Sequence, residues 1–371
     1  MPLTSLAKRF SEGNLRELRV FPSHLIDFTS NDYLGLARSK ELLELIAEQS
    51  IRDGEHLNGS TGSRLLSGNS KLAEDLEIQL SGFHGSANGL LFNSGYDANL
   101  GLFSCVAKRG DTILYDELIH ASVIDGIRLS NAFAYKFRHN DLGHLELLIS
   151  RARGSVYVAV ESIYSMDGDL SPLAELSEIC KKHQVRLLVD EAHATGIFGK
   201  KGEGRVSELG LEQAVWARVH TFGKAMGCHG AIVLGSRALR DFLVNFSRPF
   251  IFSTALPAHS LVSIKCAYQF LETHRGLRSE LEQRILYFRS KAAGSGLNSF
   301  SDHAGPIQTL HIPGNEQVKK LSLRLQAEGF DVRAITNPTV PAGKERIRIC
   351  LHAYNTQEQL DGLINSVSRN I

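Results

Sequence analysis

Residues 187–193 read LLVDEAH, a short apolar run that ends at the carboxylate of Asp190. Residues 221–227 read TFGKAMG and place the amine of Lys224 in a segment of small residues. A run this short and this apolar is typical of a strand buried on both faces. A lysine that can form a Schiff base and an aspartate that can bind a protonated ring nitrogen are what pyridoxal phosphate requires of a protein. The two segments together therefore predict a site for this cofactor.

Further short apolar runs, each bounded by turn residues, lie on both sides of this segment: ANGLLFNSG, DTILYDE, SVYVAVES and GAIVLGS. Helical patterns lie between several of them, as in SKLAEDLEIQLSGFHG and LAELSEICKKH. Alternation of strands and helices predicts an α/β fold with a mostly parallel sheet covered by helices. In such a sheet ligands collect at the carboxyl ends of the strands, where Asp190 is expected.

The pattern changes after a polar helical segment from Arg278 to Lys291. Beyond it, PIQTLHIP and ERIRICLHA have the character of strands, and VKKLSLRLQAEG and TQEQLDGLINSVS that of helices. These elements predict a smaller α+β unit. We expect an N-terminal segment over residues 1–40, a large domain over 41–275 and a small C-terminal domain over 276–371.

Composition excludes several classes of protein. The chain has 371 residues, 43% hydrophobic and 22% charged, with a formal net charge of +1. This balance gives no indication of nucleic-acid or anionic-membrane partners. No apolar run is long enough to span a bilayer, and the first residues contain no apolar stretch typical of a secretion signal. The five cysteines are scattered without a CxxC pair, which favours reduced thiols in the cytoplasm.

Several catalytic motifs are missing from the sequence. DEAH also occurs in helicases, but these need a GxxxxGK[ST] loop, and the chain has none. GxGxxG, GxSxG and HExxH are absent as well, which argues against dinucleotide-binding, serine-hydrolase and zinc-protease functions. MDGD, after Ser165, lacks the downstream oxygen ligands of a calcium loop and is interpreted as a turn. No metal site is predicted.

Two segments near the strand ends leave alternatives open. NSGYDAN follows a strand and opens a helix, so Ser94, Gly95 and Tyr96 either bind an anion or form a plain turn. His120 follows the run TILYDE and either stacks on a flat ring or caps a helix. For a lone polar residue at a helix start, capping is the commoner role.

Two arginines share one face of a predicted C-terminal strand. Arg346 and Arg348 are separated by one residue in ERIRIC, which places both side chains on the same face. An arginine on an otherwise apolar strand either binds a carboxylate of a ligand with its planar fork or forms a structural salt bridge. The sequence does not decide between these roles for either residue.

Nine segments, taken in order, resemble the α-oxoamine synthases, which belong to the fold-type I (aspartate-aminotransferase-like) pyridoxal-phosphate enzymes: SNDYLGL, STGSRLLSGN, NSGYDAN, ELIHASVIDGIRL, ESIYSMDGDLSPL, VDEAHATG, TFGKA, FSTALPA and PTVPAGKERIRICLH. The resemblance covers nearly the whole chain. It implies a large, mostly parallel sheet domain, a small C-terminal α+β domain and a homodimer with shared active sites.

For the cofactor ring, the resemblance implies that Lys224 binds it covalently and that Asp190 pairs with its pyridinium nitrogen. It also implies that His193 hydrogen-bonds the 3-hydroxyl, that Ser165 lies near the same hydroxyl, and that His120 stacks on the ring. Lys224, His120, Asp190 and His193 are thus the expected catalytic residues.

For the cofactor phosphate, the resemblance implies contacts with Thr221 and the backbone of Gly95 and Tyr96 behind Ser94. Ser253 and Thr254 would reach a phosphate in the neighbouring subunit.

For the substrate, the resemblance implies that Arg348 receives the amino-acid carboxylate, with Asn31 nearby, and that Arg16 meets the acyl substrate. GSRLLSGN, DEAHATG, TFGKA, STALPA and PTVPAG are most similar to the branch that condenses L-alanine with pimeloyl-CoA, or its acyl-carrier-protein equivalent, in biotin synthesis. The freed Lys224 amine would remove the α-proton, and the carboxylate would leave as carbon dioxide.

Two other readings of the resemblance stay open. The first is another α-oxoamine synthase, of the glycine C-acetyltransferase, 5-aminolevulinate synthase or serine palmitoyltransferase kind. The second is a non-catalytic relative that keeps the fold. Such a relative would be expected to lose the lysine or the aspartate, and Lys224 and Asp190 are both present.

Overall fold

The computed structural model describes residues 2–16, 18, 20, 22–52, 58–296, 300–301 and 303–371. Its contacts divide the chain into two compact units. The larger unit contains Gly35–Tyr164 and Leu170–Arg275, and the smaller one contains Met1–Leu34, Ser165–Asp169 and Gly276–Ile371. The N-terminal residues therefore group with the C-terminal unit instead of standing apart.

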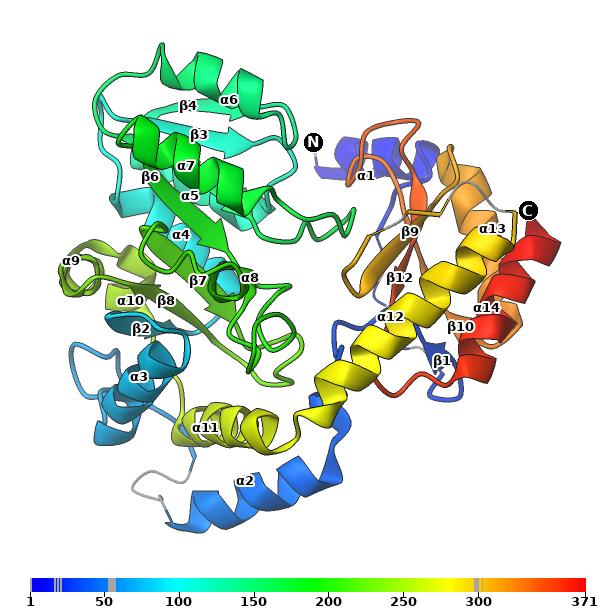
Figure 1. The fold of residues 1–371 in the computed structure, drawn as a ribbon, viewed down its shortest axis with the longest axis horizontal. Helices are drawn as coiled ribbons and strands as arrows, with labels where there is room; N and C mark the ends of the chain where they lie inside the picture. The colour runs from blue at the N-terminus through cyan, green and yellow to red at the C-terminus, as the bar shows by residue number, and fades with distance from the viewer. Residues whose placement is uncertain are drawn as a thin grey trace. The chain divides into compact units, whose positions relative to one another are not determined.

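The larger unit is built on a seven-stranded sheet with the order β2-β8-β7-β6-β5-β3-β4. Its strands are β2 (Asn88–Phe92), β3 (Thr112–Asp116), β4 (Phe133–Phe137), β5 (Val156–Glu161), β6 (Arg186–Asp190), β7 (Ala217–Thr221) and β8 (Ala231–Gly235). Figure 1 shows the sheet extending from β4 at one end to β2 at the other.

Strand direction brings the predicted segments to one edge of this sheet. Neighbours from β4 to β7 are parallel, whereas β8 is antiparallel to both β7 and β2. All strands of the sheet except β8 therefore end at the same edge. The mostly parallel sheet is confirmed, and the five predicted strands are β2, β3, β5, β6 and β8.

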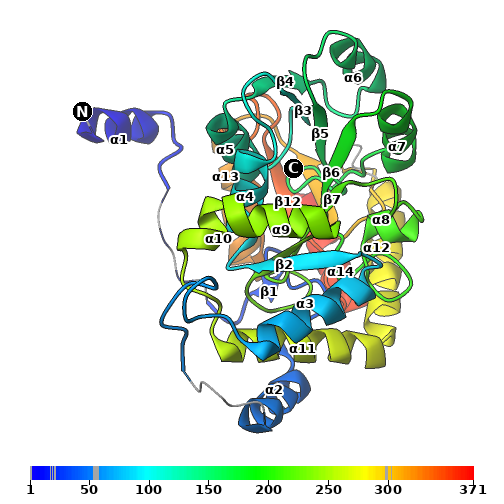
Figure 2. The same cartoon turned by 90° about the vertical axis from the view of Figure 1, so that its left-hand side faces the viewer.

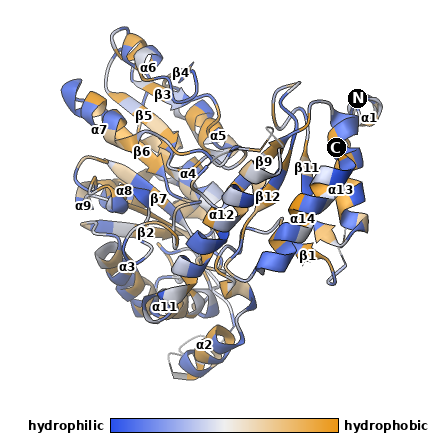
Figure 3. Ribbon diagram, turned by 45° about the vertical axis from the view of Figure 1, so that its right-hand side comes forward, coloured by the Kyte–Doolittle hydropathy of each residue, from blue (hydrophilic) through white to orange (hydrophobic). Residues whose placement is uncertain are grey.

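Helices cover both faces of the sheet because side chains alternate along each strand. One face packs on α4 (Gly95–Cys105), α5 (Ala121–Ser130), α9 (Arg237–Phe246) and α10 (Arg248–Phe252). Figure 2 shows α9 and α10 on the near side of the unit. The other face packs on α6 (Leu142–Ile149), α7 (Leu173–Lys182) and α8 (Arg205–Glu208). Figure 3 shows the resulting hydrophobic character along β5 and β6.

The remaining helices of the larger unit are α2 (Lys40–Arg52), α3 (Lys71–Phe83) and α11 (Ala258–Thr273), with a 3₁₀ turn η1 (Leu36–Arg38) before α2. The predicted helices over SKLAEDLEIQLSGFHG and LAELSEICKKH are α3 and α7. Helix α3 begins at the Ser70 cap, whose side chain accepts a hydrogen bond from the backbone N–H of Ala73.

The smaller unit is an α+β structure. An antiparallel sheet has the order β11-β12-β9, formed by β9 (Ile307–His311), β11 (Arg333–Ile335) and β12 (Arg346–Cys350). A separate parallel pair joins β1 (Ile26–Asp27) to β10 (Phe330–Asp331), which ties the N-terminal residues to this unit. The helices are α1 (Pro2–Ser11), α12 (Gly276–Gly294), α13 (Asn315–Ala327) and α14 (Gln357–Asn370). The predicted C-terminal strands and helices are confirmed.

Within the part of the chain that the structure describes, no helix is long and apolar enough to cross a membrane. The same residues contain no group of three or more His, Cys, Asp or Glu side chains that could hold a metal ion.

Candidate active site

Asp190 is the last residue of β6, in the middle of the sheet, and is 7% exposed. Its Oδ2 accepts a hydrogen bond of 2.7 Å from Nδ2 of Asn99, and its Oδ1 accepts one of 2.9 Å from the backbone N–H of Ala192. A buried carboxylate needs such donors to offset its lost hydration. Both oxygens are therefore fixed in one orientation at the carboxyl edge of the sheet.

His193 lies in a helical turn that begins immediately after β6. The backbone N–H groups of Ala194 and Thr195 donate to the carbonyl oxygen of Glu191 at 3.0 and 2.9 Å. Asp190 ends β6 directly before this turn, three residues ahead of His193. The imidazole is 5% exposed. The sequence DEAH thus provides a buried carboxylate and a buried imidazole at and just after the end of β6.

Lys224 lies in the loop between β7 and β8 and is half-buried. Its carbonyl oxygen accepts a 2.9 Å hydrogen bond from the backbone N–H of Gly227. Gly227 has a φ of 62°, and a β-carbon there would clash with the backbone at Ala37. Only glycine adopts this positive φ at low cost and also avoids the clash, because it has no β-carbon. The backbone beneath the lysine is therefore well fixed.

His120 caps α5, as expected for a polar residue at a helix start. Its Nδ1 accepts a hydrogen bond of 3.2 Å from the backbone N–H of Ser122. Burial lowers the pKa of His120, the Asp190 carboxylate raises it, and the Lys224 ammonium lowers it further. Hydrogen bonds through Ser122 and Asn99 also join this ring to Asp190. His120 can therefore cap α5 and still belong to the candidate site.

The start of α4 forms a small cradle with the end of β7. The Ser94 hydroxyl caps the helix by accepting from the backbone N–H of Asp97 at 3.1 Å. A β-carbon on Gly95 would lie 2.5 Å from Cγ2 of Thr221. Among the described residues, the buried Oγ1 of Thr221 has no hydrogen-bond partner. A helix N-terminus facing an unpaired hydroxyl is suited to a phosphate.

Tyr96 contributes its backbone to this helix start, while its side chain is 45% exposed. The phenol donates a hydrogen bond to Asp125, and its ring lies edge-on to His120 with centroids 6.5 Å apart. The exposed ring of Tyr96 therefore lies beside His120.

Ser253 and Thr254 follow α10 in the larger unit. The carbonyl oxygen of Thr254 accepts a 2.8 Å hydrogen bond from Nδ2 of Asn93, the residue before Ser94. Both residues line a cavity of about 20 Å³ together with Asn93. The FSTALPA segment is therefore joined to the start of α4 within one chain.

A second group of predicted residues lies in the smaller unit. Nε of Arg348 donates to the carbonyl oxygen of Ser165 at 2.8 Å, and its NH2 nitrogen donates to Oδ1 of Asn31 at 2.9 Å. The Asn31 oxygen also accepts from the Tyr33 hydroxyl at 3.1 Å. These contacts fix the guanidinium without using a carboxylate from the described part of this unit. Arg16, the predicted contact for the acyl substrate, lies between α1 and β1 and is exposed. Among the described residues, it forms no hydrogen bond with Arg348.

Arg346 and Arg348 have different partners although they share a strand face. Arg346 is 3% exposed and forms an ion pair with Asp167 of the MDGD turn. This is the structural salt bridge that the sequence left open. Gly168 in the same turn has a φ of 83°, and a β-carbon there would clash with the carbonyl of Ile307 in β9. The turn therefore packs directly on the sheet.

Sequence reasoning missed Asn99 and Ser122. Asn99 is 2% exposed, and its Nδ2 also donates to Oγ of Ser122 at 3.0 Å. The available signal was a polar side chain inside the apolar helix GYDANLGLFSC, where an asparagine is unfavourable without a specific partner.

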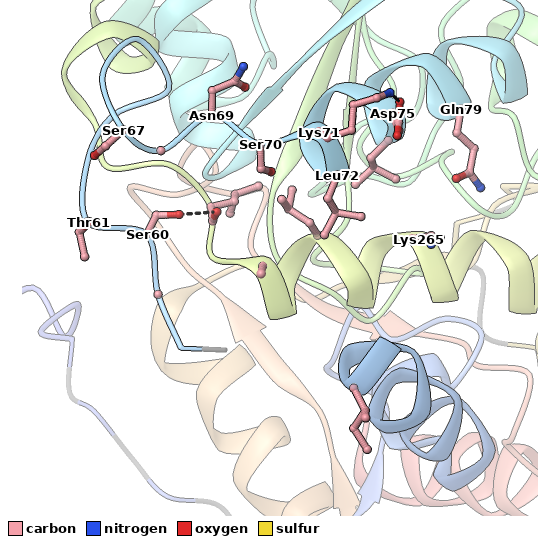
Figure 4. A pocket seen from close by; sticks show the side chains of 17 residues that line it. Ser60, Thr61, Ser67, Asn69, Ser70, Lys71, Leu72, Asp75, Gln79 and Lys265 are labelled. Carbon is pink, nitrogen blue, oxygen red and sulfur yellow. Dashed lines mark hydrogen bonds and ion pairs between the residues drawn. The ribbon is translucent and has the colours of Figure 1, made fainter. Parts of the chain in front are cut away.

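A larger cavity, of about 700 Å³, lies elsewhere in the larger unit, between α3 and the start of α11. Figure 4 shows its Ser60 hydroxyl donating to the carbonyl of Leu256, with Lys71 and Lys265 at its border. The STGSRLLSGN segment supplies much of its wall. None of the predicted cofactor residues is among the described residues that line it.

Comparison with known proteins agrees with this geometry. The chain matches the aminotransferase class I and II family over residues 23–367. It is 42% identical to 8-amino-7-oxononanoate synthase of Emericella nidulans, over 98% of this chain and 93% of that protein. It is 38% identical to the 8-amino-7-oxononanoate synthase of Marinobacter nauticus, over 93% of this chain and 87% of that protein.

Similar solved structures include both a serine palmitoyltransferase and an 8-amino-7-oxononanoate synthase. Serine palmitoyltransferase of Sphingomonas wittichii superposes with a TM-score of 0.90 at 27% identity, covering 100% of this chain and 96% of the other. The 8-amino-7-oxononanoate synthase of Francisella tularensis superposes with a TM-score of 0.82 at 28% identity, covering 94% and 98%. A further serine palmitoyltransferase structure, 26% identical with a TM-score of 0.90 over 100% and 96%, contains pyridoxal phosphate.

Proposed function

Because this chain belongs to the aminotransferase class I and II family and, within it, to the α-oxoamine synthases, we propose that it condenses L-alanine with pimeloyl-CoA or pimeloyl-acyl-carrier protein to give 8-amino-7-oxononanoate for biotin synthesis. In this acyl transfer a carbon–carbon bond forms between Cα of alanine and the thioester carbonyl carbon. The alanine carboxylate leaves as carbon dioxide, and the thiol carrier is released.

The residues of the larger unit fit pyridoxal phosphate. The unpaired Oγ1 of Thr221 and the α4 amides behind Ser94 suit its phosphate. The buried carboxylate of Asp190 suits its ring nitrogen, and Lys224 supplies the amine. When bound, pyridoxal phosphate supplies an electron sink for bonds broken at Cα of an amino acid. We propose that this unit is the cofactor-binding domain, predicted over 41–275.

The proposed roles follow from the chemistry of each side chain. Asp190 holds a proton on the ring nitrogen of the cofactor, because an ionised carboxylate stabilises the charged form of its partner. The Lys224 amine removes the proton from Cα of the amino acid. His120 covers the ring, and His193, with Ser165, hydrogen-bonds the 3-hydroxyl.

The remaining proposed roles concern the phosphate and the substrates. Arg348 receives the amino-acid carboxylate with its planar fork, and Asn31 orients the fork through the 2.9 Å hydrogen bond. Ser253 and Thr254 are proposed phosphate ligands in a neighbouring subunit. Arg16 is the proposed contact for the acyl substrate.

The single observation that carries the proposal is the chain of hydrogen bonds that joins His120 to Asp190 through Ser122 and Asn99. Burial lowers the pKa of His120 most, and the further lowering by Lys224 agrees with an amine at the same end of the sheet. His120, Asp190 and Lys224 lie on three separate elements of the sequence, after β3, at the end of β6 and after β7. An anionic partner, an amine and an imidazole that share one place constitute the chemistry expected of this cofactor.

A second candidate function is supported by the structural comparison. Serine palmitoyltransferase superposes with a TM-score of 0.90, whereas the Francisella tularensis synthase gives 0.82. The sequence identity of 42% to an 8-amino-7-oxononanoate synthase favours the first candidate. The same family chemistry would also serve a glycine C-acetyltransferase or a 5-aminolevulinate synthase.

A substrate-pair assay tests the proposal. L-Alanine, glycine and L-serine are each combined with pimeloyl-CoA, pimeloyl-acyl-carrier protein, acetyl-CoA, succinyl-CoA and palmitoyl-CoA, and carbon dioxide and product mass are recorded. We expect the highest rate with L-alanine and a pimeloyl thioester. If another pair reacts and this pair does not, the proposed substrates are wrong while the family chemistry stands.

We also propose that the enzyme is a cytoplasmic homodimer. The described cysteines are all free thiols, in keeping with a reducing compartment. Phe246, at the end of α9, and Phe252, the first residue of the FSTALPA segment, are 58% and 69% exposed. Large exposed aromatic side chains on neighbouring helices are typical of a surface that a partner covers. Sedimentation of the purified protein tests the dimer.

A further inference from the structure

A chain of hydrogen bonds connects the Asp190 carboxylate to the His120 ring. Nδ2 of Asn99 lies 2.7 Å from Oδ2 of Asp190 and 3.0 Å from Oγ of Ser122. That Oγ lies 2.8 Å from Nδ1 of His120. Asn99 and Ser122 are 2% and 0% exposed, so water does not compete for these contacts. The chain links α4, α5 and the end of β6.

Counting donors fixes the orientation of Asn99. A side-chain amide has two hydrogens on nitrogen, and both are used, one toward Asp190 and one toward Ser122. Among the described residues, Oδ1 of Asn99 is buried without a hydrogen-bond partner. Turning the amide over would place that oxygen against a carboxylate oxygen, where both atoms accept. The unsatisfied oxygen is thus the cost of aiming the nitrogen at Asp190.

The same counting fixes the proton on His120. The Ser122 hydroxyl accepts from Asn99, so its single hydrogen is available for Nδ1 of His120 at 2.8 Å. The backbone N–H of Ser122 also points at Nδ1, at 3.2 Å. A nitrogen that accepts from two donors carries no hydrogen itself. The neutral ring therefore carries its hydrogen on Nε2.

We propose that Asn99 and Ser122 are positioning residues: Asn99 orients the Asp190 carboxylate toward the cofactor ring, and Ser122 holds His120 as the Nε2–H tautomer. The first part rests on the proposed function, because it takes Asp190 as the partner of the ring nitrogen. The second part concerns this chain alone. Neither residue needs to touch a substrate for either effect.

Two substitutions separate the links of this chain. Asn99→Leu keeps a similar volume and removes both donated hydrogen bonds together with the unsatisfied Oδ1. It also leaves Oδ2 of Asp190 without this donor, so folding of the variant is checked directly. Ser122→Ala removes only the hydroxyl and leaves the contact between Asn99 and Asp190. Asn245→Leu, on the exposed surface of α9, is the matched control for the first substitution.

The first measurement is ¹⁵N NMR of labelled histidine in the cofactor-free protein, which reads the tautomer directly. We expect His120 to carry hydrogen on Nε2 in the unaltered protein, and the share of the Nδ1–H form to rise in Ser122→Ala and in Asn99→Leu. An Nδ1–H ring in the unaltered protein, or no change in either variant, overturns the second part of the proposal. This measurement decides that part whichever substrates the enzyme uses.

The second measurement is the dissociation constant of pyridoxal phosphate, from titration of the apoprotein. We expect Asn99→Leu to raise it about 10- to 100-fold, the effect of losing a hydrogen bond to a charged group. Ser122→Ala and Asn245→Leu should each stay within about threefold of the unaltered protein, and circular dichroism checks that all three fold. Unchanged binding in folded Asn99→Leu overturns the first part. Normal cofactor binding without product from L-alanine would instead count against the proposed function.

Discussion

Gly95 and Thr221 approach so closely that a β-carbon on Gly95 would lie 2.5 Å from Cγ2 of Thr221. Gly95 begins α4 and Thr221 ends β7, so the contact joins a helix N-terminus to a strand end at the carboxyl edge of the sheet. The same threonine carries the buried Oγ1 without a partner among the described residues. Because Gly95 has no side chain, the start of α4 leaves room for an anion beside Thr221.

Substitution of Gly95 by alanine is expected to weaken cofactor binding. The added methyl group forces Thr221 to move, and overpacking of this kind costs about 1–3 kcal/mol. We expect the dissociation constant of pyridoxal phosphate to rise about tenfold or more in Gly95→Ala. Gly82→Ala is the matched control, because a β-carbon at Gly82 in α3 meets nothing within 4 Å. Equal affinity in the two variants would contradict the phosphate cradle.

Replacement of Lys224 by alanine is expected to abolish both attachment of the cofactor and proton removal. Loss of a general base typically lowers the rate about 10²- to 10⁴-fold. Treatment with borohydride followed by peptide mass spectrometry should find pyridoxal on the Lys224 peptide of the unaltered protein. Lys182→Ala, which removes an exposed partner of Glu146, serves as the control. A label found on another lysine would rule out the assigned role.

Arg348 and Arg346 are expected to respond differently to the same change. Arg348→Lys removes the planar fork, so the KM for L-alanine should rise about 10- to 100-fold with cofactor affinity unchanged. Arg346→Lys should lower stability instead, because that side chain is buried against Asp167. Steady-state kinetics and urea unfolding of both variants check this contrast. A similar rise in KM for both would argue against separate roles.

Stability is expected to fall as the pH drops below about 6.5. Burial lowers the pKa of His84 to about 3, and burial, followed by His84 and Arg218, lowers that of His220 well below its ordinary value. The unfolded chain takes up protons on both rings near pH 6.5, whereas the folded protein does not. Each of the two rings therefore lowers the free energy of unfolding by up to about 1.4 kcal/mol for every pH unit below 6.5.

Urea unfolding between pH 7.5 and 5 measures this slope. The His84→Asn variant should show a shallower slope than the unaltered protein, because one of the two buried rings is gone. His259→Asn, at an exposed histidine, should keep the full slope. A steep slope that survives in the first variant would mean that other groups set the pH dependence.

Strand prediction succeeded where burial leaves a clear pattern and failed where it does not. β6 is apolar up to Asp190, and the sequence marks it plainly. β7 reads ARVHT and is fully buried, but its polar residues interrupt the apolar run that would have predicted a strand. Arg218 donates to the carbonyl of His84 at 2.8 Å, and Nδ1 of His220 lies 2.9 Å from Oγ1 of Thr195. These partners come from distant parts of the chain, so no local pattern shows them.

An edge strand was missed for the opposite reason. β4 reads FAYKF, and all but its last residue are exposed. It lies at the end of the sheet beside β3, so only Phe137 is covered. The absence of an apolar run here reflects its position at the edge. That position depends on the strand order, which local sequence does not contain.

From the sequence alone one can predict the alternation of strands and helices, the place of Asp190 at a strand end and the small-residue turn around Lys224. These features follow from local rules of periodicity and turn chemistry. Which polar groups contact one another depends on the folded chain. Asn99 reaches Asp190 across 91 positions of sequence, and Arg348 reaches Asn31 across 317. Such contacts are set by sheet order and helix packing, because a buried polar group must find its partner wherever the fold brings one.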